Sequence, residues 1–269
     1  MRGSTRTNIY SNRIGTTASG NAAIPNGQDG IVVTYYGSTD ISSAITIGSA
    51  TDAAKKNIIS GNTDCGVKLT GGSHDVVLDG NYIGLDVNGM TAIPNGEAGV
   101  AIINSDNNVL STYGESTLPQ FISGNSREGI YISNSMGTDI NKMTFIGVAA
   151  DYGTSRGNGL EGVKLDTGTT YTEIYSQKIV YNVRAGIAVV GNTSVGNVLL
   201  PWFIGRNGGL PIDLGDDGFT SNGSQVPPGP NGWQNYPVPS LMTADGFYGQ
   251  TCADCEVYIF RAVNDPTKS

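Results

Sequence analysis

The sequence is poor in charged residues, in cysteine and histidine, and in long apolar runs. Asp, Glu, Lys and Arg make up 14% of the 269 residues, against ~25% in ordinary soluble domains. The 15 basic residues are scattered and the formal net charge is −8, which disfavours a nucleic-acid binder or a ligand of anionic membranes. Three Cys and one His are too few for an ordinary structural zinc site. No apolar run approaches the ~20 residues of a membrane span, so we expect no membrane insertion.

Glycine, in contrast, is abundant. The 39 Gly show no three-residue period, which excludes collagen, and helix-spaced runs of Ala, Glu, Lys and Leu are missing, which excludes bundles and coiled coils. With 38% hydrophobic residues the chain is too apolar to be disordered. An all-β fold remains.

An internal repeat organises the chain. Residues 12–30 (NRIGTTASGNAAIPNGQDG) align without gaps on residues 81–99 (NYIGLDVNGMTAIPNGEAG), with ten identities in nineteen positions. A second motif, NIISGNTDCG at 57–66, returns as QFISGNSREG at 120–129. The chain therefore alternates two related units.

Each unit closes with an anchor glycine followed by apolar residues at alternate positions. The seven anchor glycines are Gly30, Gly66, Gly99, Gly129, Gly162, Gly186 and Gly209. A period of two indicates strands, and units that shrink to about 23 residues fit the coils of a parallel β-helix. We predict about seven coils, with the middle residues of the segments, such as Lys68, Tyr131 and Pro211, pointing outward. A β-sandwich or propeller would also alternate, but a propeller blade needs about 40 residues.

Two further features concern the corners and the end of the chain. Asn62, Asn125 and the corner residues aligned with them are expected to stack as a hydrogen-bonded ladder. We predict that the β-helix covers residues 1–215, that residues 216–239 form a Pro/Gly-rich exit loop, and that residues 240–269 begin a β-sandwich-like module. Residues 1–20 show no signal peptide, so the chain is expected to be an excised piece of a longer protein.

Cys252 and Cys255 form a Cys-x-x-Cys pair. Such a pair can be a redox motif, half a zinc site or a small disulfide, and no thioredoxin-like βαβ pattern surrounds it. We favour the disulfide, which implies an oxidising, extracytoplasmic setting.

Several of these motifs together carry a resemblance. The repeated ISGN, NYIG and IPNG elements, the exit sequence IDLGDDG, and TCADCEVYIF resemble secreted bacterial or archaeal proteins of the right-handed, single-stranded parallel β-helix class in the pectate-lyase-like superfamily. The resemblance implies that fold, a following immunoglobulin-like module and an extracellular or cell-surface location. It does not imply one function, because the superfamily includes lyases, glycoside hydrolases, epimerases and adhesins.

The column just before the anchor glycines holds the candidate catalytic residues. Glu128 and Glu161 occupy the same place in successive units, which would set them ~4.8 Å apart, near the ~5 Å carboxylate separation of a retaining glycosidase. Glu97 lies one coil earlier. The candidate substrate-binding residues around them are Tyr131, Lys164, Arg127 and Lys68. In the alternative interpretation, Glu128 and Glu161 belong to a solvated turn column whose charge is neutralised by Arg127, Lys164 or Arg184.

The sequence offers two other possibilities, a lyase with bound calcium and a tyrosine strip that stacks on sugars. A β-eliminating lyase needs a Lys or Arg base and often Ca²⁺, for which Asp213, Asp216 and Asp217 offer oxygen ligands. No cofactor other than calcium is expected. Outward tyrosines could form a strip for stacking sugar faces, and the candidates are Tyr35, Tyr36, Tyr82 and Tyr131.

The leading hypothesis is a rigid β-helical segment of a secreted multidomain protein that presents a polar, Tyr-bearing face to a polysaccharide or cell-surface glycan. Its partners are then the glycan and the flanking domains of the same protein. The alternative is a carbohydrate-active enzyme, a glycoside hydrolase before a polysaccharide lyase, acting over Glu128 and Glu161.

Overall fold

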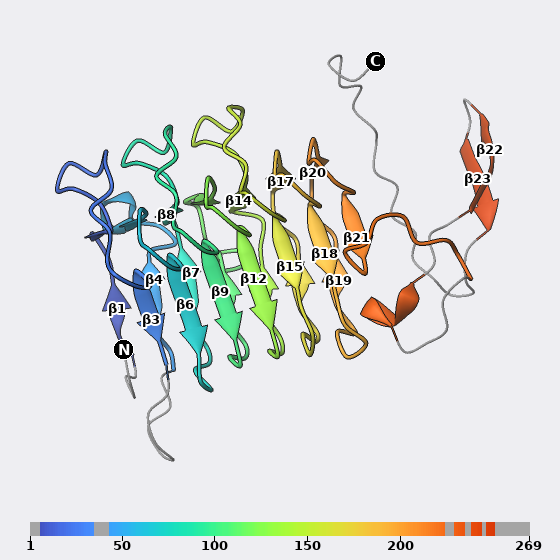
Figure 1. Cartoon of the computed structure of the whole chain (residues 1–269), viewed down its shortest axis with the longest axis horizontal. Coiled ribbons are helices and arrows are strands. Elements are labelled where there is room, and N and C mark those ends of the chain that lie inside the picture. Colours follow the sequence, from blue (N-terminus) through green and yellow to red (C-terminus); the bar gives the residue numbers. More distant parts are fainter. Residues whose placement is uncertain (1–5, 35–42, 224–228, 235–237, 244–245, 251–269) are drawn as a thin grey trace.

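The computed structural model describes residues 6–34, 43–223, 229–234, 238–243 and 246–250. Three parallel sheets of seven strands each run the length of the molecule (Figure 1). Sheet 1 contains β1 (Asn8–Ile9), β4 (Thr46–Gly48), β7 (Val77–Asp79), β10 (Val109–Leu110), β13 (Asp139–Ile140), β16 (Glu173–Ile174) and β19 (Val198–Leu199). Sheet 2 contains β2 (Arg13–Ile14), β5 (Ile58–Ile59), β8 (Tyr82–Ile83), β11 (Gln120–Ile122), β14 (Thr144–Ile146), β17 (Lys178–Val180) and β20 (Ile204–Gly205). Sheet 3 contains β3 (Ile31–Val33), β6 (Val67–Thr70), β9 (Val100–Ile103), β12 (Ile130–Ser133), β15 (Val163–Leu165), β18 (Ile187–Val189) and β21 (Ile212–Leu214).

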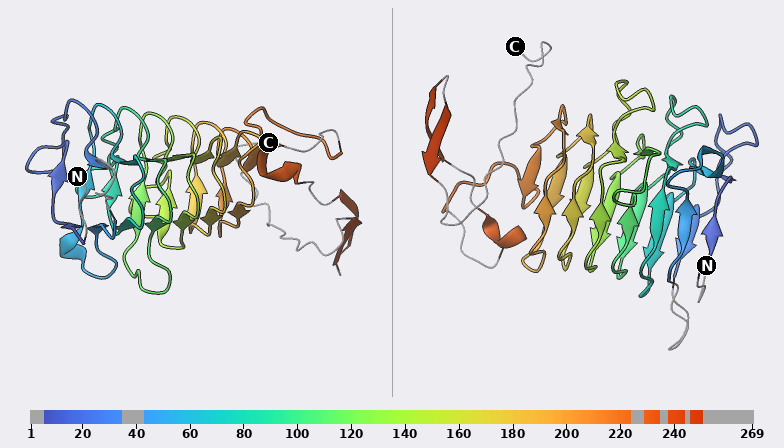
Figure 2. Two further views of the ribbon diagram at one scale, coloured as in Figure 1. Left: turned by 90° about the horizontal axis from the view of Figure 1, so that it is seen from below. Right: turned by 180° about the vertical axis from the view of Figure 1, so that it is seen from behind.

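The chain visits sheets 1, 2 and 3 in turn, and each round is one coil, numbered 1 to 7 from the N-terminus. In Figure 1 it runs down the near sheet 3, returns upward behind, and advances from the N-terminal to the C-terminal end, which is a right-handed path. The views from below and from behind show the same stack (Figure 2). The predicted parallel β-helix of about seven coils is therefore confirmed.

The core is an apolar column between the three sheets. Its residues come from the inward positions of the strands, such as Ile31 and Val33 in β3 and Ile130 and Ile132 in β12, all nearly inaccessible to solvent. Because successive side chains of a strand point to opposite faces, one outward residue lies between the two inward residues of each strand. The short strands have few hydrogen bonds of their own, so each coil is stabilised mainly by burying its apolar face against the neighbouring coils.

The anchor glycines are explained by close approach between coils. A Cβ on Gly129 would lie 2.6 Å from the carbonyl oxygen of Gly162, and a Cβ on Gly162 would lie 2.7 Å from that of Gly186. In coil 7 the equivalent position is Pro211, whose carbonyl oxygen accepts from Ile187 N, and not the predicted Gly209. Since no described coil follows, Pro211 can carry a Cβ and lack an N–H without loss. The prediction that Pro211 is the outward residue of its strand is therefore wrong. Asp213 occupies the outward position, opposite Ala188.

A ladder of seven asparagines joins all the coils at the corner before sheet 3. Each side-chain amide bonds to the next, through Asn26, Asn62, Asn95, Asn125, Asn158, Asn182 and Asn207. This confirms the ladder predicted from Asn62 and Asn125. A second ladder at the corner between sheets 1 and 2 runs through Asn12, Asn57, Asn81 and Gln120 only. The corner before sheet 3 is thus held at every coil, whereas the other is held over coils 1 to 4.

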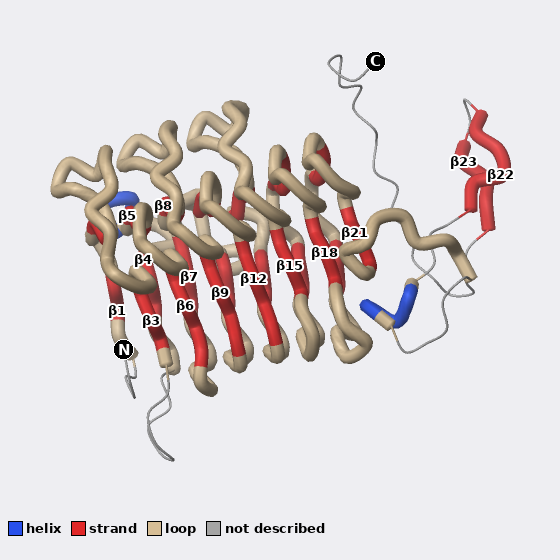
Figure 3. The backbone as a smooth tube through the Cα atoms, viewed as in Figure 1, coloured by secondary structure: helices blue, strands red, loops and turns tan. Residues whose placement is uncertain are grey.

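Three long hairpins, at residues 15–26, 84–95 and 147–158, project at one edge of the stack (Figure 3). Val87 N donates to Gly20 O and Ala150 N donates to Gly89 O, so the three hairpins are joined in a row. They flank an aromatic cluster on the outside of sheet 2, in which Tyr82 and Phe121 lie edge to face. The hairpins therefore cover part of the outer face of sheet 2.

Two short 3₁₀ helices and a hairpin complete the described structure. The first is η1 (Ala53–Lys55), and η2 (Pro230–Trp233) follows the last coil. Asn231 of η2 donates from its backbone to Ser194 O and accepts from Asn197 N, as a further rung would. The strands β22 (Val238–Thr243) and β23 (Gly246–Gln250) pair antiparallel. No helix among the described residues is long and apolar enough to cross a membrane.

Candidate functional site

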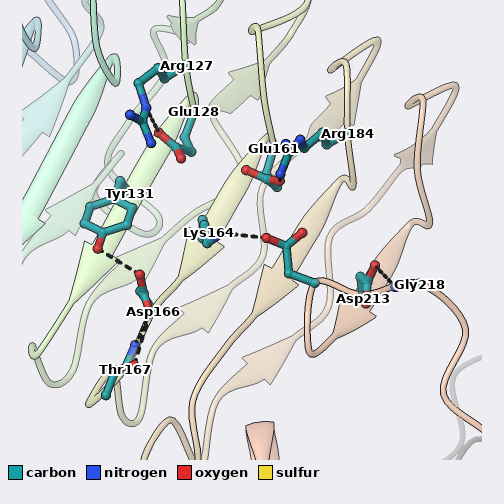
Figure 4. A network of polar contacts seen from close by, with 11 residues as sticks. Arg127, Glu128, Tyr131, Glu161, Lys164, Asp166, Thr167, Arg184, Asp213 and Gly218 are labelled. Atoms are coloured by element: carbon teal, nitrogen blue, oxygen red, sulfur yellow. Dashed lines mark hydrogen bonds and ion pairs between the residues drawn. The ribbon is translucent and has the colours of Figure 1, made fainter.

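The outer face of sheet 3 brings most of the predicted site residues together (Figure 4). The strands that follow Glu128 and Glu161 are paired with Ile130 opposite Val163, so the two glutamates occupy equivalent positions in coils 4 and 5. Gly129 N donates to Glu161 O at 3.0 Å, which links the two turns directly. Tyr131 and Lys164 are also opposite each other on these strands.

Both glutamates are buried and lie near arginines. Glu128 is 4% exposed, and its Oε2 lies 3.5 Å from Arg127 Nε, which also lies 3.3 Å from Glu97 Oε2. Glu161 is 0% exposed, and its Oε1 lies 3.5 Å from Arg184 Nη1. The geometry matches the neutralised turn column, with arginines as the partners, except that the column is covered and not solvated.

Glu161 is the most unusual group on this face. Within the described structure neither of its carboxylate oxygens accepts a hydrogen bond. Burial raises the pKa of Glu161, and the negative charges of Asp216 and Glu128 act in the same direction, against Lys164. A carboxyl group with a raised pKa beside a second carboxyl group is the arrangement that glycosidases use for a general acid.

A second part of the network lies along the strands of sheet 3. Tyr131 donates from its hydroxyl to Asp166 Oδ2 at 2.9 Å, and Lys164 Nζ donates to Asp216 Oδ2 at 2.5 Å. Asp216 comes from the segment after β21, so it reaches back over Ala188, which is fully buried, to coil 5. Burial opposes ionisation of Asp166, but hydrogen bonds from Thr167 N and the Tyr131 hydroxyl lower its pKa overall.

The candidate calcium ligands are spread over different partners. Asp213 Oδ2 accepts a hydrogen bond from Gly218 N at 3.0 Å, and its Oδ1 is buried without a hydrogen-bond partner among the described residues. Asp216 Oδ2 accepts from Lys164 Nζ. Burial raises the pKa of Asp213. Among the residues that the structure describes, Asp217 included, no group of three or more His, Cys, Asp or Glu side chains could hold a metal ion.

Other predicted residues lie elsewhere. Lys68 is on coil 2, two coils from Tyr131, and its Nζ lies 3.8 Å from Asp29 Oδ2. Tyr82 is buried against Phe121 on sheet 2, so it cannot share a strip with Tyr131, and that prediction is wrong. Tyr35, Tyr36, Cys252 and Cys255 lie outside the described residues.

Sequence reasoning missed a second acidic pair, Asp139 and Glu173, on sheet 1. The two are opposite each other in β13 and β16. The signal was present in the repeated Thr-acid-Ile of residues 138–140 and 172–174. It went unnoticed because these strands have only two residues and no anchor glycine before them.

No family model, no curated protein and no solved structure matches this chain.

Proposed function

We propose that this chain is a rigid β-helical segment of a secreted or cell-surface multidomain protein, and that the outer face of sheet 3 contacts glycans. The observation that carries the proposal is the charged network on coils 4 to 6, in which Arg127, Lys164 and Arg184 are each paired with a carboxylate at or beside the stacked strands of sheet 3. Polar groups held in this way need little reordering when they bind the hydroxyl groups of a sugar chain.

Rigidity follows from the same architecture. Three continuous sheets and a seven-rung asparagine ladder connect every coil to the next, so bending the stack would break buried hydrogen bonds. A straight segment of this kind suits a spacer between modules at a cell surface. The flanking domains of the longer protein are then its other partners.

Binding tests the proposal. Immobilised polysaccharides of a mixed panel should retain the protein, and Arg127→Gln should weaken that retention about tenfold, because Arg127 is exposed at the edge of the network. The control is Lys55→Gln, which changes an exposed lysine on η1 whose ion-pair partner in the described chain is Asp52. Equal loss in both variants, or no retention of the wild type, would contradict the proposal.

A second candidate, a glycoside hydrolase, is favoured by one observation: the raised pKa of Glu161 next to Glu128 on the adjacent coil. For catalysis, the arginines that cover the two carboxyls would have to move when substrate binds. Reducing-sugar release from the same panel tests this candidate. Release by the wild type that Glu161→Gln abolishes would support it, and no release from any polymer would exclude these polymers as substrates.

A further inference from the structure

An exposed aromatic row runs along the corner between sheets 1 and 2. Tyr113 in coil 4 is 72% exposed and Trp202 in coil 7 is 70% exposed. Tyr175, in coil 6 between them, is partly exposed. Backbone hydrogen bonds from Tyr175 N to Ile140 O and from Trp202 N to Ser176 O fix these residues to the neighbouring coils. Large aromatic side chains left this exposed on a rigid surface are typical of a contact site.

A pair of carboxylates lies beside this row. Asp139 and Glu173 are opposite each other on β13 and β16, both partly exposed. Burial and the charge of Glu173 raise the pKa of Asp139. Burial also raises the pKa of Tyr175, and Glu173, Asp139 and Tyr113 contribute, so these groups share one electrostatic environment.

Within the described part of the chain, the pair has no ion-pair partner. None of the ion pairs within the described residues includes Asp139 or Glu173. The nearby Lys142 lies with its Nζ 5.8 Å from the centroid of the Trp202 ring. Like charges directly opposite on adjacent strands are destabilising. A cationic ligand would relieve this repulsion, and the aromatic row would pack against its apolar parts.

We propose that the outer face of sheet 1 over coils 4 to 7 binds a chain of amino sugars with free amino groups. An ammonium group of the chain lies between Asp139 and Glu173, and the neighbouring sugar rings stack on Tyr113, Tyr175 and Trp202. The site uses a different sheet and different residues from the proposed glycan face of sheet 3, so it does not depend on that proposal.

The length of the aromatic row favours a sugar chain over a basic peptide. Tyr113, Tyr175 and Trp202 lie in coils 4, 6 and 7, so the row extends over about 14 Å along the helix axis. The rings of a sugar chain can stack along that length, whereas a lysine-rich peptide offers ammonium groups to the two carboxylates but no flat rings to the aromatic row.

Isothermal titration calorimetry at pH 6 with glucosamine oligomers tests the site. The wild type should bind oligomers with free amino groups at least tenfold more tightly than N-acetylated oligomers of the same length. Glu173→Gln and Trp202→Ala should each weaken this binding about tenfold, and both positions are at the surface, so the variants should fold. Asp75→Asn removes an exposed acid elsewhere and should bind as the wild type does.

Three results would overturn the inference: no binding of the free-amine oligomer, equal affinity for the acetylated oligomer, or tighter binding of oligolysine than of the sugar. Arg127→Gln on sheet 3 should leave this binding unchanged. The two proposals can therefore fail separately, because each is tested by variants on its own sheet.

Discussion

The outer faces of sheets 3 and 1 both place two acidic residues at equivalent positions of adjacent coils. The two pairs differ in their burial and in their ion pairing. Glu128 and Glu161 are buried and each lies near an arginine. Asp139 and Glu173 are partly exposed and have no ion-pair partner among the described residues. The comparison indicates that a parallel β-helix tolerates stacked acids either by covering and pairing them or by leaving them open to solvent and to ligands.

The largest effect is expected where sheet 3 is held in register. Asn125→Ala removes a buried amide that accepts from Asn95 Nδ2 and donates to Asn158 Oδ1. The loss should destabilise the fold by about 2–4 kcal/mol, because buried polar groups on both sides lose partners. Thermal or urea unfolding measures this. Asn12→Ala, at the exposed end of the other ladder, is the control and should cost ~1 kcal/mol or less. Equal losses of stability in the two variants would show that the two ladders stabilise the fold to the same extent.

Removing one cation should change stability much more on sheet 3 than on sheet 1. Arg184→Met leaves Glu161 buried without its ion pair, so we expect a loss of about 1–3 kcal/mol at pH 7. Near pH 4 the loss should shrink, because the carboxyl is then protonated. Lys142→Met beside the sheet 1 pair should change stability by less than ~0.5 kcal/mol. A loss for Arg184→Met that does not depend on pH would mean that the arginine acts through packing alone.

Glu161→Gln tests the sign of the pKa shift. The folded protein raises the pKa of Glu161, so ionising this group disfavours folding once the pH exceeds its unfolded pKa of ~4.3. The Gln variant should therefore match the wild type in acid and be more stable by up to ~1 kcal/mol at pH 7. Denaturant titrations at several pH values measure the difference. A variant that is less stable at pH 7 would show that the pair with Arg184 outweighs burial.

The smallest effect is expected on sheet 1. Glu173→Gln removes the charge that helps to raise the pKa of Asp139, so this pKa should fall towards its ordinary value. Stability at neutral pH should rise by only ~0.2–1 kcal/mol, since one like-charge repulsion is relieved. Carboxyl NMR titration reports the pKa directly. Asp151, whose pKa is held at about 2 by hydrogen bonds from Thr154 and Gly153, is an internal control that should not move.

Some features of the site were readable from the sequence and others were not. The stacking of Glu128 on Glu161 followed from the repeat, because equal spacing from an anchor glycine fixes the register of a coil. The burial of both side chains did not follow, since the surroundings of Glu161 include Arg184 and the returning Asp216, which come from other coils. The error at Gly209 has the same origin: glycine is required only where another coil packs above, and coil 7 has Pro211 there.

The amino-acid sequence by itself determined the parallel β-helix of seven coils, its inward apolar rows and its asparagine ladder. These features repeat at short, regular intervals, and each depends on the chemistry of one residue type at one position of the coil. Only the tertiary structure decided which acids are covered and which stay open, and that Tyr82 and Tyr131 face different directions. Side chains from a neighbouring coil, such as Arg184 beside Glu161, or brought back from beyond the last coil, such as Asp216, cannot be placed until the coils are stacked.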